Sequence, residues 1–215
     1  MKEFKKPERK TDKISIPLEE TKLPEGAELL DGAGVEDFAE APHYYTLQSG
    51  DLAIAGTDKG VNYKDHNEDV IVISPNENFT AVLDGVGGGG KGGIAAEALG
   101  QALLEAPDDV RFAVQKGISK MAEKGLLVDE TVFISVRLLG NTKFGKYLEI
   151  FQSGDAKLIV IRKNGRINFE SKDDSLVQIL LDSGAITADA ALYHPHRNVI
   201  SKSVSLDRPN DEPKT

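Results

Sequence analysis

The order of apolar segments along the chain is the feature that most restricts its fold. Three short segments rich in valine and isoleucine have the composition of consecutive strands: LAIAG (52–56), DVIVIS (69–74) and FTAVLD (79–84). Two helical patterns follow them, and further strand patterns come after the helices. Consecutive strands that are interrupted once by a helix pair favour an α+β domain with antiparallel sheets over an array of βαβ units.

The later elements are predicted from apolar spacing and from turn residues. The expected helices cover 94–106, about 109 to 125, 176–182 and 188–192, and the expected strands are TVFISVRLL (131–139), KYLEIFQ (146–152), KLIVIR (157–162) and RINFE (166–170). Asn164 and Gly165 lie between the last two strands, and this dipeptide favours a type I′ hairpin.

Residues 1–48 differ in composition from the rest of the chain. Basic residues crowd Lys2 to Lys13, acidic residues follow from Glu19 to Glu40, and few large apolar residues recur at any period. Such a segment cannot offset the entropy lost on ordering it. We therefore predict a flexible leader over residues 1–48 and one folded domain over residues 49–215.

The charge and composition of the chain exclude several classes of protein. The formal net charge of −9 argues against general binding to nucleic acids or to membrane surfaces, which select basic faces. Without cysteine, the chain has neither disulfides nor thiolate metal sites. Its start lacks the apolar core of a secretory signal, and no apolar run approaches the ~20 residues of a spanning helix. We expect a monomeric, cytoplasmic protein.

The segment TAVLDGVGGGGKGG (80–93) invites comparison with nucleotide-binding loops. It fits G-x-x-x-x-G-K, but Gly92 stands where a serine or threonine should hold Mg²⁺. It also fits G-x-G-x-x-G, which five glycines satisfy easily by chance. Two interpretations stay open for the glycines, a phosphate-binding loop and a simple turn between a strand and a helix.

Asp84 is the residue that neither interpretation explains. It ends an apolar strand and is followed by glycine, so its carboxylate and the next carbonyl are both accessible to a metal ion. Glu68 and Asp69 stand where a loop enters another strand, and at least one would share a rim with Asp84 if the two strands are neighbours. Asp155 lies between two further strands. Taken singly, each of these acidic residues is also compatible with a solvated turn.

Four motifs occur in an order that is similar to that of a known family. They are NED (67–69), LDGVGG (83–88), GDAKL (154–158) and DDSLVQILLDSGAITADAALYHPHRNVIS (173–201). In these motifs the chain resembles the metal-dependent protein phosphatases, the type 2C-like serine/threonine phosphatases, over roughly residues 50–206. The resemblance implies a four-layer α-β-β-α sandwich of two antiparallel sheets flanked by helices, with two Mn²⁺ or Mg²⁺ ions and a weaker third ion at one end.

The resemblance also implies a role for each candidate residue. Asp84 would bridge two ions, and Gly85 would ligate through its carbonyl. Glu68 and Asp69 would support the centre through bound water. Asp155 would hold a weaker third ion, and Lys64 would bind phosphate. The implied reaction is hydrolysis of phosphoserine or phosphothreonine in a protein, either a kinase target or a kinase. Hard oxygen ligands select such ions, and two ions acidify a shared water for in-line attack, with Asp84, Glu68 and Asp69 as the catalytic carboxylates.

Three departures from the family pattern favour an alternative function. Lys64 replaces an arginine that grips phosphate with two prongs. Val86 stands where many members have a histidine. The family's later Ser-Asp-Gly and Asp-Asn motifs have no counterpart, so the expected fold is incomplete at its C-terminal end. The alternative is a catalytically impaired pseudophosphatase that acts as a protein-binding or regulatory module.

Overall fold

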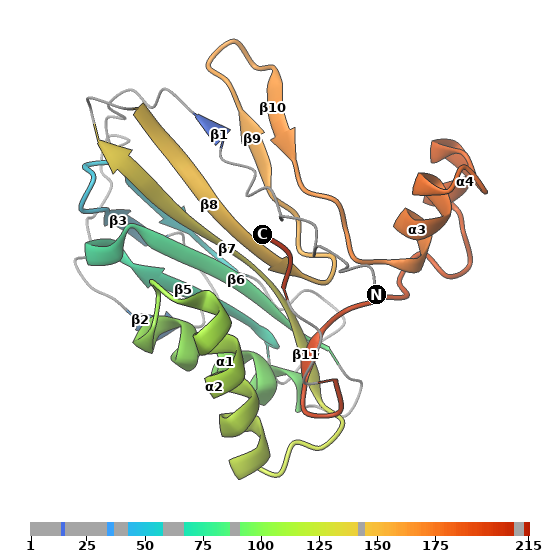
Figure 1. The fold of residues 1–215 in the computed structure, drawn as a ribbon, viewed down its shortest axis with the longest axis horizontal. Helices are drawn as coiled ribbons and strands as arrows, with labels where there is room; N and C mark the ends of the chain where they lie inside the picture. Colours follow the sequence, from blue (N-terminus) through green and yellow to red (C-terminus); the bar gives the residue numbers. More distant parts are fainter. Residues whose placement is uncertain are drawn as a thin grey trace, which may run out of the picture.

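A seven-stranded antiparallel sheet forms the centre of the molecule (Figure 1). The structure is a computed structural model, and it describes residues 14–15, 34–36, 43–57, 67–86, 91–141, 145–208 and 213–215. The strand order is β1-β8-β7-β6-β5-β2, and β11 pairs with β7. The strands of this sheet are β1 (Ile14–Ser15), β2 (Gly34–Glu36), β5 (Asp69–Ser74), β6 (Phe79–Val86), β7 (Glu130–Asn141), β8 (Gly145–Ser153) and β11 (Val204–Ser205).

The connection between β5 and β6 fixes the register of the two strands that matter most for the site. A short 3-10 helix, Pro75–Glu77, is followed by Asn78 in the left-handed conformation, with φ of 52°. This tight reversal pairs Ser74 with Phe79, and the ladder then runs to its other end, where Asp69 lies opposite Asp84.

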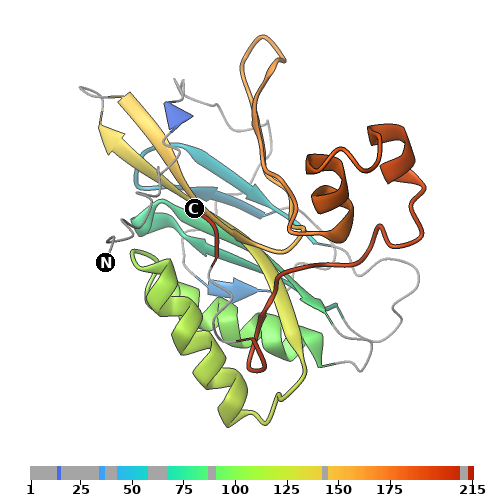
Figure 2. The ribbon, with the colours of Figure 1, turned by 45° about the vertical axis from the view of Figure 1, so that its right-hand side comes forward.

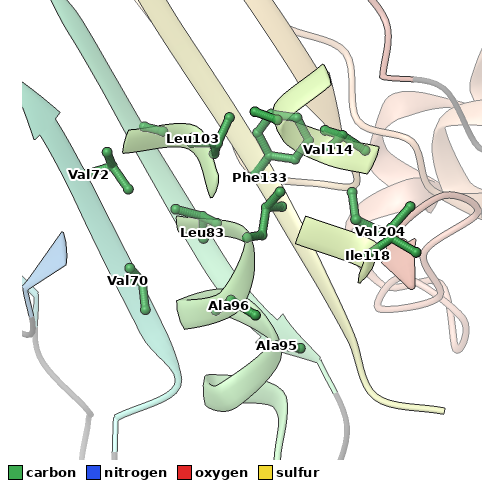
Figure 3. Packing of buried hydrophobic residues seen from close by; sticks show 14 of the residues in the cluster. Val70, Val72, Leu83, Ala95, Ala96, Leu103, Val114, Ile118, Phe133 and Val204 are labelled. Atoms are coloured by element: carbon green, nitrogen blue, oxygen red, sulfur yellow. The ribbon is translucent and has the colours of Figure 1, made fainter. Parts of the chain in front are cut away.

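Two helices cover one face of the sheet, α1 (Gly92–Glu105) and α2 (Val110–Glu123) (Figures 1 and 2). Alternate strand residues point toward them, because successive side chains of a strand face opposite sides. Figure 3 shows Leu83 and Phe133 from the sheet packed with Leu103 of α1 and Val114 of α2. All four of these side chains are buried, so this face of the sheet carries the larger hydrophobic core.

A β-hairpin of β3 (His43–Thr46) and β4 (Leu52–Ala55) packs on the opposite face. Tyr45 and Ala55 of the hairpin form a second buried cluster with Ile71 and Ile73 of β5. These isoleucines alternate with Val70 and Val72, which belong to the helix-side core. The sheet is therefore buried on both faces at β5, with helices on one side and a second antiparallel sheet on the other.

The remaining elements extend from the end of β8. They are β9 (Ile159–Ile161), β10 (Ile167–Glu170), α3 (Leu176–Asp182) and α4 (Ala188–Leu192). The β9–β10 pair forms a third, two-stranded sheet, and α3 and α4 lie apart from α1 and α2 (Figures 1 and 2).

The hairpin between β9 and β10 differs from the expected type I′ turn. A type I′ turn needs positive φ at both central residues, but Asn78 is the only non-glycine residue with positive φ in the part of the chain that the structure describes. The Gly165 N–H donates to the Arg162 carbonyl at 2.8 Å, and Gly165 has φ of +77°. This is a three-residue loop with a left-handed glycine. The Asn164 side chain accepts from the Arg166 N–H at 3.1 Å, and this bond holds Asn164 within the turn.

The predicted α+β class, with antiparallel sheets flanked by helices, is confirmed. Predicted and observed bounds of the helices differ by about two residues or fewer, as for 94–106 against α1. The sequence patterns missed β1, β2 and β3, all within the leader predicted over residues 1–48, because strands of two to four residues show too few alternations to be recognised. None of the helices in the described part of the chain has the length and apolar character that crossing a bilayer demands.

Candidate metal centre

Asp69 and Asp84 lie directly opposite each other at the end of the β5–β6 ladder. Side chains of paired antiparallel residues share one face of the sheet, with Cβ atoms roughly 4.5–5.5 Å apart. The face that carries this pair is the one that the β3–β4 hairpin covers, because Leu83, next to Asp84, faces the helices. Two like charges in this position destabilise a sheet unless a cation neutralises them. The neighbouring strands that the sequence analysis required are thus present.

Glu68 lies next to this pair, beside the start of α1. Its carbonyl accepts a hydrogen bond from the Gly85 N–H at 3.0 Å, which extends the ladder by one more residue. A Cβ added to Gly93 would lie 3.3 Å from the Glu68 Cα, so the first turn of α1 packs closely against Glu68. The strand end, the loop and the helix start therefore meet at Glu68 and Gly85.

Asp155 reaches the same end of the sheet through β7 and β8. Val132 of β7 is the strand partner of Asp84, and Phe133 is the partner of Ser153. Gly154, the next residue, has φ of +99°, and a Cβ there would lie 2.2 Å from a methyl carbon of Val132. Only glycine fits this contact, and it brings the following residue, Asp155, toward Asp84.

The electrostatic environment of Asp84 includes the other three candidate carboxylates. Burial and, in decreasing order, the negative charges of Asp69, Asp155 and Glu68 together raise the pKa of Asp84 to about 6. The Asp84 side chain is nevertheless exposed and therefore accessible to a ligand. The other three carboxylates named from the sequence thus each act on Asp84.

The donor set fits a hard divalent cation, although the side chains are not gathered around one point. Within the ranges that the structure describes, no three acidic or histidine side chains lie close enough together to hold a metal ion. Mutual repulsion opposes such gathering, and each carboxylate can turn about its own side-chain bonds. The backbone register that brings Asp69 opposite Asp84 is fixed, and carboxylate and carbonyl oxygens are the ligands that Mg²⁺ and Mn²⁺ prefer.

Three residues that the sequence analysis did not single out hold the candidate ligands in place. The Thr57 hydroxyl donates to the Asp69 carboxylate at 3.3 Å, and the Asn67 side-chain carbonyl accepts from the Asp69 N–H at 3.0 Å. The Thr131 hydroxyl, which is fully buried, donates to the Asp84 carbonyl at 2.9 Å. Asn67 belongs to the NED motif and was recognisable. The two threonines carry no signal, because threonine is common in strands and their bonds depend on tertiary contacts.

The glycines of the 80–93 segment have a packing role in the described residues. A Cβ on Gly85 would lie 2.2 Å from the Gly92 backbone, and a Cβ on Gly92 would lie 2.6 Å from the Gly85 backbone. The end of β6 and the start of α1 therefore cross in backbone contact, which no other residue type permits. This contact favours the strand-to-helix turn over the nucleotide loop. Residues 87–90 and the predicted phosphate-binding Lys64 lie outside the described residues.

A pocket of about 500 Å³ lies elsewhere, between the end of β8, β10, α3 and the C-terminal residues. Gln152, Asp174 and Lys214 are among its lining residues, and the carboxylates of Asp69 and Asp84 are not. The pocket therefore does not mark the candidate metal centre, which is defined by strand register and charge.

Comparison with known proteins gives relatives of one kind. No protein-family model matches the chain. The serine/threonine protein phosphatase PstP of Mycobacterium tuberculosis is 28% identical to it over 160 residues, which are 70% of this chain and 30% of PstP. The crystal structure of that phosphatase has 27% sequence identity and a TM-score of 0.61, and it covers 73% of this chain and 68% of the solved chain. The chain is similar in sequence and in fold to serine/threonine protein phosphatases.

Further comparisons agree with this assignment. The serine/threonine phosphatase Stp of Listeria monocytogenes is 25% identical over 167 residues, 70% of this chain and 66% of Stp. A structure of the PstP catalytic domain in complex with two manganese ions has 25% identity and a TM-score of 0.58, over 73% of this chain and 67% of the solved chain. The resemblance that the motifs indicated is confirmed in sequence and in fold. The chain spans 30% of the length of PstP and 66% of the length of Stp.

Proposed function

We propose that the chain binds divalent cations at the end of β5 and β6 and hydrolyses phosphoserine and phosphothreonine in proteins. The observation that carries the proposal is the Asp69–Asp84 pair, together with the charges of Asp155 and Glu68 that act on Asp84. The relatives are serine/threonine phosphatases, and the catalytic domain of one was solved with two manganese ions. Mn²⁺ and Mg²⁺ both suit the oxygen ligands, with Mn²⁺ favoured by that solved relative.

Each candidate residue has a proposed role in binding the cations. Asp84 would bridge two ions, and its carbonyl is held by the Thr131 hydroxyl. Gly85 would offer its carbonyl, while Glu68 and Asp69 would support the centre, with Asp69 held by Thr57. Divalent ions bound here would lower the pKa of a coordinated water toward neutrality and stabilise charge on phosphoryl oxygens.

Asp155 and Lys64 complete the proposed site. Asp155 would hold a weaker third ion, and Lys64 would bind the substrate phosphate through its positive charge. The substrate would be a phosphorylated protein, a kinase target or a kinase, in a signalling role. A cytoplasmic location and a monomeric state belong to the same proposal.

The test is release of phosphate from a phosphothreonine peptide by this chain, with and without Mn²⁺. We expect hydrolysis only with Mn²⁺, and a loss on the order of 100-fold or more in Asp84→Asn. The matched control is Asp108→Asn, the same change at an exposed turn residue, which should keep full activity. Absence of both Mn²⁺ binding and hydrolysis would refute the proposal.

A second function follows from the same measurements. The described carboxylates do not gather at one point, which also suits a pseudophosphatase that keeps the fold and binds a protein partner without turnover. A folded chain that shows neither tight binding of two Mn²⁺ ions by calorimetry nor hydrolysis of a phosphopeptide would favour this alternative, because only the enzyme needs both ions.

A further inference from the structure

Gln152, near the end of β8, is a buried polar side chain that serves the Asp155 loop. Only 2% of it is exposed, although an amide in the protein interior is costly unless its hydrogen bonds are satisfied. Its side-chain NH₂ donates to the Gly154 carbonyl at 3.1 Å and to the Ala156 carbonyl at 2.9 Å. The Gly154 carbonyl belongs to the peptide group just before Asp155 and the Ala156 carbonyl to the peptide group after Ala156, so one side chain holds the loop on both sides of Asp155.

The backbone of Gln152 is itself fixed. It pairs with Ile134 of β7, and its N–H and C=O both bond to Lys214 at 2.9 Å. Gln152 and Ile134 share the face of the sheet that carries Asp84, because Ile134 pairs with Val82, two residues before Asp84. The amide therefore acts from a rigid strand on a loop at the same face.

Gly154 receives a second set of bonds from Asp174. The Gly154 N–H donates to the Asp174 carboxylate at 3.3 Å, and the Asp174 N–H donates to the Gly154 carbonyl at 2.8 Å. The Asp155 side chain remains exposed. Every anchor in this loop thus acts on the peptide groups and leaves the carboxylate available.

We propose that Gln152 is a positioning residue for Asp155, which it holds on the Asp84 side of the sheet for binding of a divalent cation. The inference rests on the proposed function. Asp155 and Asp84 repel each other, and a free loop would relieve this repulsion by moving away. Ordering a loop costs conformational entropy, so bonds made from a rigid strand in advance of cation binding lower the cost of binding.

The experiment is a calorimetric Mn²⁺ titration of the whole chain and three variants. Gln152→Met keeps the length of the side chain but removes both donated bonds. Asp155→Asn removes the ligand charge itself. Gln178→Met is the matched control, because Gln178 lines the same pocket as Gln152 but donates to Asp182 instead of the Asp155 loop.

We expect Asp155→Asn and Gln152→Met each to weaken the weaker Mn²⁺ site by about 10-fold, the lower end of the effect of losing an outer partner of a metal ligand. Gln178→Met should bind as the unmodified chain does. If Asp155→Asn weakens binding and Gln152→Met does not, the positioning role is wrong while the proposed function stands. If Asp155→Asn has no effect, the metal-binding role of Asp155 fails and the positioning role falls with it.

A measurement on the unmodified chain covers the case in which Gln152→Met does not fold. The side-chain amide protons of Gln152 should exchange slowly with solvent, since the NH₂ group donates to two carbonyls. Addition of Mn²⁺ should broaden the backbone amides of residues 154–156 before those around Gln178. Rapid exchange of the Gln152 amide protons would overturn the proposal.

Discussion

At the scale of the residue, the site centres on one unfavourable pair. Asp69 and Asp84 lie opposite each other on two paired strands, and the negative charges of Asp155 and Glu68 also act on Asp84. Without a cation this arrangement costs stability, since like charges placed opposite each other on a sheet repel. A residue that destabilises the free chain but stabilises the chain once a ligand is bound is typical of a functional site.

The pH dependence of stability follows from Asp84. Its pKa is raised from 3.8 to about 6, so between these values the folded chain binds more protons than the unfolded chain does. The favourable contribution of Asp84 is complete below about pH 3.8 and is lost as pH rises through about 6. Without divalent cations, Asp84→Asn should therefore match the unmodified chain near pH 4 and exceed its unfolding free energy by roughly 1 kcal/mol at pH 7, a figure reduced for solvent screening.

Urea denaturation in EDTA at several pH values measures this difference. Asp108→Asn serves as the control and should show no such trend. Saturating Mn²⁺ at pH 7 should reverse the order, because only the unmodified chain gains stability from the ion. A difference between Asp84→Asn and the unmodified chain that stays constant from pH 4 to pH 7 would contradict the assigned environment of Asp84.

Gly85 is a second residue with a decisive local role. Its Cβ position lies 2.2 Å from the Gly92 backbone, and backbone atoms cannot turn away as a side chain can. Gly85→Ala should therefore destabilise the chain by about 1–3 kcal/mol or displace the start of α1. Gly93→Ala is the matched control, because its nearest contact is 3.3 Å and helix interiors favour alanine. Thermal unfolding compares the two, and equal effects would show that the Gly85–Gly92 contact is not tight.

At the scale of the element, the β3–β4 hairpin supports the strand that carries Asp69. It covers Ile71 and Ile73 of β5, on the same face as Asp69. Tyr45 is 5% exposed in this contact. Tyr45→Ala should cost about 2–4 kcal/mol of unfolding free energy, as large-to-small changes in a core do. The neighbouring Tyr44 is only partly buried and points to the other side of the hairpin, so Tyr44→Ala should cost clearly less. If Tyr45→Ala lowered the unfolding free energy by less than Tyr44→Ala does, the hairpin would not be part of the core.

The sequence predicted the helices and most strands well but missed several very short strands. Helices α1 and α2 and strands β5 to β8 each show several repeats of their apolar period, which is why their positions were recognisable. β1, β2 and β11 are two or three residues long, and their pairing is made by backbone groups that leave no side-chain pattern. The turn at Asn164 was expected in the wrong form because its bond to Arg166 competes with the type I′ geometry.

At the scale of the whole molecule, the candidate site joins segments that are far apart in the chain. The sequence named Glu68, Asp69, Asp84 and Asp155 as one group, and in the structure Asp69 pairs with Asp84 while the charges of Asp155 and Glu68 act on Asp84. It could not give the register that sets Asp69 against Asp84, nor the Gly154–Val132 contact that directs Asp155, because both depend on strand pairing. The supporting bonds of Thr57, Thr131 and Gln152 were beyond sequence reasoning for the same reason.

We propose that the carboxylates of Glu68, Asp69, Asp84 and Asp155 form one divalent-cation site. The most direct measurement is titration of the ¹⁵N-labelled chain with sub-stoichiometric Mn²⁺, whose unpaired electrons broaden the NMR signals of nearby amides. We expect the signals of amides next to Asp69, Asp84 and Asp155 to broaden together, while those of α2 and α4 keep their intensity. Asp84→Asn should abolish this broadening. Broadening scattered over the acidic surface, or unchanged in Asp84→Asn, would contradict it.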